Sequence, residues 1–158
     1  MAAQPIPEGF AQLSPHIVVR DAKSAIEFYT KAFGAEEISR MPGPGGQWIM
    51  HAELKIGDSR LMLADEMPGN CGSRSPQALG GTPVTIHLYV KDADAVVDRA
   101  VKAGATITMP VTDAFWGDRY GRLRDPFGHE WGVATHKKDM TKQEVMAAAE
   151  KFFATVGA

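Results

Sequence analysis

The sequence predicts an α+β fold in which one strand–helix unit occurs twice and a separate helix follows at the C-terminal end. The main observation is an internal repeat. Residues 14–22 recur at residues 85–93, 71 positions later, which carries His16 onto His87. In each half an apolar, β-branched run precedes apolar residues at helical spacing, and two alternating runs around a turn come later.

The first half begins with a strand at residues 13–20. Asp21 is suited to cap a following helix, and Gly34 is suited to end it. The apolar residues Ala25, Ile26, Tyr29, Ala32 and Phe33 form the predicted buried side of that helix. Residues 48–56 and 60–65 then alternate as two strands, joined by the turn residues Gly57, Asp58 and Ser59.

The second half follows the same order. Residues 84–90 form a strand, Asp92 caps a helix, and Gly104 ends it. Residues 119–124 and 129–135 are two further strands around the turn at residues 125–128, where Trp131 is expected in the core. The Asp-Pro-Phe-Gly sequence is explained by the backbone conformation of the turn, and we assign it no catalytic role.

Two further segments lie outside the repeat. Residues 67–82 are rich in Gly, Ser and Pro and are expected to form a linker or a flap. Near the C-terminus, Thr141 and Glu144 form a capping-box pattern ahead of a helix at about residues 141–155. Its apolar stripe is expected to pack on the parent domain or across a dimer.

Composition favours a small molecule as the partner. The 158 residues include 44% hydrophobic side chains and carry a net charge of −2, with no basic cluster suited to nucleic acid. No apolar run approaches the roughly 20 residues that span a membrane. The single cysteine, Cys71, fits a reducing compartment, so we expect a soluble, cytoplasmic protein without a nucleic-acid or membrane partner.

Four segments together resemble a known family. They are PHIVVRDAKSAIEFYTKAFGAEE, HAELKIGDSRLMLADE, LGGTPVTIHLYVKDADAVVDRAVKAGA and FWGDRYGRLRDPFGHEWGVATH. They resemble the PhnB-like branch of the vicinal oxygen chelate superfamily, which includes glyoxalase I, bleomycin-resistance proteins and dioxygenases. The resemblance implies one domain of two βαβββ modules, at about residues 12–66 and 83–136, whose curved mixed sheets surround a cleft. It also implies a homodimer, and a divalent metal in the metal-dependent members.

Strand alternation places Ser14, His16, Arg60, Met62, Thr85, His87, Tyr89, Glu130 and Gly132 toward that cleft. Compared with the glyoxalase I pattern, the four metal-ligand positions fall on Ser14, Met62, Thr85 and Gly132. None of these is a good ligand for a divalent ion. We therefore expect no cofactor at the usual site.

A displaced metal site is the alternative. If the first and last strands of a module run antiparallel, then His16, His87 and Glu130 reach one level of the cleft, and two histidines with a carboxylate suit Zn, Ni, Fe or Mn. Otherwise the histidines hydrogen-bond a ligand, and Glu130 pairs with Arg60. An Arg60 side chain directed at Glu130 argues against a metal there.

Other side chains suit binding or catalysis. His51 and Glu53 lie two residues apart on one strand face and together suit general acid–base catalysis, although a solvated sheet edge is the alternative. Trp48, Tyr89, Phe115, Trp116 and Tyr120 supply aromatic surface for a pocket. Arg119 and Arg122 offer guanidinium groups for an anion.

Three functions follow, in order of preference. The first is a metal-independent protein that binds a small, partly aromatic molecule between its modules. The second is a metal-dependent lyase, isomerase or dioxygenase that uses His16, His87 and Glu130. The third is an interaction protein without a small ligand, which a dry core without a pocket would favour.

Overall fold

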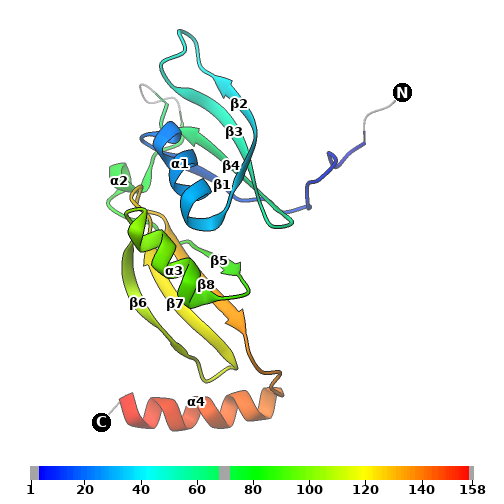
Figure 1. Cartoon of the computed structure of the whole chain (residues 1–158), viewed down its shortest axis with the longest axis vertical. Coiled ribbons are helices and arrows are strands. Elements are labelled where there is room, and N and C mark those ends of the chain that lie inside the picture. Colours follow the sequence, from blue (N-terminus) through cyan, green and yellow to red (C-terminus); the bar gives the residue numbers. More distant parts are fainter. Residues whose placement is uncertain (1–3, 68–71, 157–158) are drawn as a thin grey trace.

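The computed structural model describes residues 4–67 and 72–156 and contains one four-stranded mixed sheet in each half of the chain. In the first half, β1 (His16–Val19), α1 (Ala22–Phe33), β2 (Glu36–Pro42), β3 (Ile49–Ile56) and β4 (Ser59–Asp65) form a sheet of order β1-β4-β3-β2 with one helix. In the second half, β5 (Thr85–Tyr89), α3 (Ala93–Lys102), β6 (Thr106–Asp113), β7 (Asp118–Arg124) and β8 (Glu130–His136) repeat the arrangement in the order β5-β8-β7-β6. Figure 1 shows the two modules end to end, which confirms the predicted fold.

The direction of the first strand in each module differs from the expectation. β1 runs parallel to β4, and β5 runs parallel to β8, so the assumption of antiparallel first and last strands was wrong. The physical reason is the helix after the first strand. It returns the chain, so that the second strand points the same way as the first, and two antiparallel pairings then leave the fourth strand parallel to it.

Capping carboxylates fix where each helix begins. Asp21 and Asp92 accept backbone hydrogen bonds from Ser24 and Ala95, at 2.9 and 3.0 Å, as the sequence predicts for N-caps. Asp65, at the end of β4, accepts a further hydrogen bond of 2.7 Å from the backbone of Ala22 at the start of α1. The helix is thereby fixed to the strand beside its N-terminus.

The two modules share a core in which α1 packs against α3 and the β7–β8 turn. The Tyr29 hydroxyl and the Trp131 indole both donate to one carboxylate oxygen of Asp125, at 2.6 and 2.9 Å. Phe33 lies against Trp131 with ring centroids 4.6 Å apart, and Trp131 is buried as predicted. Burial and the neighbouring Asp125 carboxylate hold the pKa of Tyr29 well above its usual value. Asp125 therefore joins the modules as well as shaping its turn.

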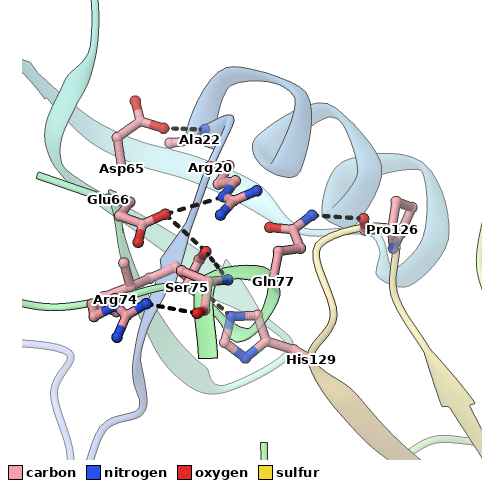
Figure 2. Close-up of polar contacts among 11 residues, drawn as sticks. Arg20, Ala22, Asp65, Glu66, Arg74, Ser75, Gln77, Pro126 and His129 are labelled. Atoms are coloured by element: carbon pink, nitrogen blue, oxygen red, sulfur yellow. Dashed lines mark hydrogen bonds and ion pairs between the residues drawn. The ribbon is translucent and has the colours of Figure 1, made fainter. Parts of the chain in front are cut away.

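The described part of the linker holds both modules together (Figure 2). It contains a short helix, α2 (Pro76–Leu79), which sequence patterning did not predict. The Ser75 hydroxyl, fully buried, donates to Glu66 at 2.9 Å, and the Gln77 amide donates to the carbonyl of Pro126 at 3.3 Å. Residues 72–82 therefore contact both modules. Cys71 lies outside the described residues.

Helix α4 (Lys142–Val156) stands apart from both sheets below the second module (Figure 1) and has no buried residue. The predicted capping box is present: the backbone of Thr141 donates to Glu144 at 2.8 Å, and the backbone of Glu144 donates to the Thr141 hydroxyl at 3.2 Å. Phe152 and Phe153 approach the ring of Phe115, with centroids 5.4 and 6.0 Å apart. No helix among the described residues is long and apolar enough to span a membrane.

Candidate functional site

Each sheet has one face covered by a helix and one open face. On the first sheet, Ile17, Val19, Leu61 and Leu63 are buried toward α1, and the alternate residues lie on the open face. The open-face residues that the alternation predicts are His16, His51, Glu53, Arg60 and Met62 on the first sheet, and Thr85, His87, Tyr89, Tyr120, Arg122, Glu130 and Gly132 on the second. Among the described residues, no hydrogen bond, ion pair or ring contact joins the first group to the second.

Four predicted ligand-binding residues gather on the second sheet. The rings of His87 and Tyr120 stack with centroids 5.8 Å apart and an interplanar angle of 12°. Tyr89 lies 4.6 Å from His87, and Trp116 lies 5.4 Å from Tyr120, centroid to centroid. We call these four side chains, which come from β5, β7 and the loop before β7, the aromatic platform.

Asp118 fixes the outer side chains of the platform. Its carboxylate is almost fully buried and accepts hydrogen bonds from the Tyr89 hydroxyl at 2.9 Å and the Trp116 indole at 3.0 Å. Burial alone would raise the pKa of Asp118, but the hydrogen bonds from His136, Tyr89 and Trp116 bring it below its usual value. Asp118 was not predicted as a site residue. Its position between Trp116 and Tyr120 in the sequence was the signal that could have indicated it.

His136 completes this network at the end of β8. Its Nδ1 lies 2.8 Å from Asp118 and its Nε2 lies 3.0 Å from Asp139. Hydrogen bonds to Asp139 and to Asp118 raise the pKa of His136 above its usual value. Since an ionised carboxylate only accepts, both ring nitrogens donate when the imidazole is charged.

Gly132 shows why the usual ligand position on β8 holds no side chain. A Cβ at position 132 would lie 3.0 Å from the Tyr120 ring and hydroxyl, and 3.2 Å from Nδ1 of His87. The platform therefore occupies the space that a metal-ligating side chain at this position would need.

The displaced metal site is not assembled within the chain. His87 pairs with Gly132 across β5 and β8, whereas Glu130 pairs with Thr85, two residues before His87. Glu130 accepts from Arg124 at 2.7 Å and from Thr108 at 3.3 Å, so its expected pairing with Arg60 is wrong. No group of three His, Cys, Asp or Glu residues suited to a metal ion occurs in residues 4–67 and 72–156. His16, His87 and Glu130 do not fit a shared ion in this geometry.

Arg122 is a cation on the open face of the second sheet. Its Nη2 donates to the Thr85 hydroxyl at 2.8 Å, while its Nε is buried and has no partner among the described residues. Arg119, on the opposite face of β7, donates to Asp94 at 2.8 Å and to Asp113 at 3.1 Å. The structure therefore distinguishes two arginines that the sequence left equivalent.

The first sheet carries a separate polar group. The rings of His16 and His51 meet edge to face at 5.7 Å, and His51 Nε2 lies 3.6 Å from Glu53. Burial, and then the neighbouring His51, lower the pKa of His16. Met62 stands between His16 and Glu53 in the strand register.

Two predicted residues lie away from the platform. Arg60 donates to the carbonyl of Gly9 at 3.3 Å, and its guanidinium lies 5.6 Å from the centre of the Phe10 ring. The contacts of its guanidinium are therefore with the N-terminal segment. Trp48, expected to line the aromatic pocket, packs instead over Gly43 in the β2–β3 loop, where any side chain at position 43 would collide with its ring.

A hollow between the modules adjoins the platform. It measures about 1100 Å³, and His87, Tyr89 and His136 line it together with the β3–β4 turn of the first module and the start of α3. Lys91 and Arg99 add positive charge to its wall. The hollow therefore reaches the β5 edge of the platform, at His87 and Tyr89, whereas Trp116 and Tyr120 are not among its lining residues.

Two relatives resemble the chain in sequence over most of its length. An uncharacterized protein of Mycobacterium bovis is 51% identical over 138 residues, covering 86% of this chain and 90% of the relative. The trivalent organoarsenical cleaving enzyme of a Bacillus species is 27% identical over 114 residues, covering 72% of this chain and 65% of that enzyme.

Solved structures give the same result. TioX from Micromonospora sp. ML1 superposes with a TM-score of 0.63 at 28% identity, covering 80% of this chain and 98% of that one. A PhnB protein from Bacillus cereus shares the fold at 16% identity, with a TM-score of 0.60, covering 79% of this chain and 99% of the other. A model of the glyoxalase/bleomycin resistance protein/dioxygenase superfamily matches residues 10–133. The chain therefore belongs to this superfamily.

Proposed function

We propose that the chain is a small-molecule-binding protein that holds a flat, partly aromatic ligand against the aromatic platform of the second sheet. The observation that carries this proposal is the set of contacts among His87, Tyr89, Trp116 and Tyr120. Tyr89 is 61% exposed, so its ring surface is open to a ligand.

Rigidity and space both support ligand binding. Asp118 holds Tyr89 and Trp116 in place, so these rings lose little conformational freedom when a ligand stacks on them. The hollow beside His87 and Tyr89 argues against the interaction-protein alternative, which a closed, dry core would favour.

A metal-dependent lyase, isomerase or dioxygenase has less support. Its proposed ligands His16, His87 and Glu130 do not converge in the chain, and Glu130 is already neutralised by Arg124. The pair His51 and Glu53, with His16 beside it, has the groups for proton transfer on the first sheet. No described contact connects that pair to the platform.

Binding of a neutral aromatic probe, 2-naphthamide, followed by Trp fluorescence in a Trp48→Phe background, tests the proposal. We expect His87→Ala and Tyr120→Ala each to weaken binding about five- to ten-fold, because a stacked ring contributes on the order of 1 kcal/mol. His16→Ala is the matched control, since it removes the repeat-equivalent histidine from the other sheet and is expected to leave binding unchanged.

Far-UV circular dichroism confirms that each variant is folded. If 2-naphthamide and its carboxylate analogue 2-naphthoate both fail to bind the protein, or if both platform variants bind as tightly as the parent, the platform is not the ligand site.

A further inference from the structure

We propose that the ligand carries a singly charged oxyanion, such as a carboxylate, and that Arg122 binds this group beside the aromatic platform. The inference rests on the proposed function and adds the chemical class of the ligand to it. Its starting point is the buried Arg122 Nε, which has no hydrogen-bond partner among the described residues.

The guanidinium of Arg122 lacks a counter-charge. An arginine stays protonated in proteins, and a buried N–H without an acceptor is unfavourable. Its one described partner is the neutral hydroxyl of Thr85, at 2.8 Å. An anion beside the guanidinium would supply the missing counter-charge and would gain charge-assisted hydrogen bonds from its accessible N–H groups.

Nearby acids are already engaged elsewhere. Glu130, on the same face, accepts from Arg124 and Thr108, and Asp118 accepts from Tyr89, Trp116 and His136. Among the described residues, Arg122 therefore has no carboxylate to pair with. An anionic ligand would supply the missing charge.

Arg122 is also correctly placed relative to the platform. The strand register puts Arg122 opposite Gly132, and Gly132 is opposite His87. Tyr120 precedes Arg122 by two residues on β7, so both side chains lie on the open face. A flat ligand stacked on His87 and Tyr120 would have its edge near the guanidinium.

Arg60 gives an internal comparison. It too has a buried nitrogen, Nη1, without a partner, but the Gly9 carbonyl and the Phe10 ring from the N-terminal segment already contact its guanidinium. Arg122 has no such cover among the described residues. A planar guanidinium matches the two oxygens of a carboxylate, which favours this group as the anion.

The test compares 2-naphthoate with its neutral isostere 2-naphthamide by isothermal titration calorimetry. We expect the parent protein to bind 2-naphthoate at least about ten-fold more tightly, and Arg122→Gln to lose this preference while keeping its affinity for 2-naphthamide. Arg122→Lys keeps the charge and should retain part of the preference. Arg119→Gln is the control, because it changes net charge equally on the opposite face of β7.

Each outcome separates the two proposals. Equal affinity of the parent protein for both probes would overturn the anionic assignment and leave the proposed function standing. A preference that survives in Arg122→Gln, or that disappears equally in Arg119→Gln, would remove the assignment to Arg122. If neither probe binds the parent protein, both proposals are overturned.

Discussion

At the scale of single residues, Asp118 is the group on which the candidate site depends. One buried carboxylate receives hydrogen bonds from a tyrosine, an indole and an imidazole. Each donor comes from a different segment: Tyr89 from β5, Trp116 from the loop before β7, and His136 from β8. Asp118 thus links strand pairing to the position of two platform rings.

The raised pKa of His136 leads to a prediction about pH. Because the folded protein binds the His136 proton more tightly than the unfolded chain, this contribution to stability is present below about pH 6.5 and is lost as pH rises through the folded pKa. The free energy of unfolding in urea should therefore fall between pH 6 and 8 in the parent, relative to His136→Gln.

The lowered pKa of His16 makes its contribution to stability change with pH in the opposite direction. Because both proteins contain His16, the difference in unfolding free energy between the parent and His136→Gln isolates the contribution of His136. A difference that stays constant across this pH range would show that the bonds to Asp118 and Asp139 do not hold the imidazolium in solution.

Sequence alone predicted part of the site at this scale. Period-two alternation placed His16, Met62, His87 and Tyr89 on the open faces, because side-chain direction in a strand follows from position. The alternation did not predict the hydrogen bonds of Asp118 or the ion pair of Glu130 with Arg124. Those depend on which strands are neighbours, and in what direction they run.

At the scale of elements, the strands that bury one face were predicted from the sequence, and the exposed strands were not. β3, β4, β7 and β8 alternate between a core and an open face, and the sequence identified each of them to within one residue at both ends. β2 is exposed along its whole length, so it lacks the apolar alternation that reveals a strand. β6 was missed for the same reason, since none of its residues is buried.

Burial also separates the two capped helices. α3 buries Val96, Val97 and Ala100 against the core, whereas α4 has no buried residue although its capping box is complete. Formation of α3 is therefore coupled to the whole fold, and formation of α4 is a local equilibrium.

Removing each cap tests this difference. We expect Asp92→Ala to cost about 1 kcal/mol and to lower the melting temperature by about 2–4 °C. Thr141→Ala should leave the melting temperature almost unchanged and should accelerate hydrogen exchange of the α4 amides. A drop in melting temperature for Thr141→Ala as large as that for Asp92→Ala would show that α4 belongs to the cooperative core.

At the scale of the whole molecule, the repeat predicted two equivalent modules, and each module contributes an open sheet face. The modules differ in what those faces carry: a His–His–Glu group on the first sheet and the aromatic platform with Arg122 on the second. The modules contact through α1, α3 and the Tyr29–Asp125 hydrogen bond. The homodimer expected from the family resemblance stays a prediction.

Amide chemical shifts of ¹⁵N-labelled protein, followed during titration with 2-naphthoate, would locate the bound ligand on one sheet or the other without a mutation. We expect the largest shifts at residues 85–89, 118–122 and 130–136, which carry most of the aromatic platform, Asp118 and Arg122. Shifts confined to residues 14–18 and 51–62, with the second sheet unaffected, would contradict this expectation and would place the binding site on the first sheet.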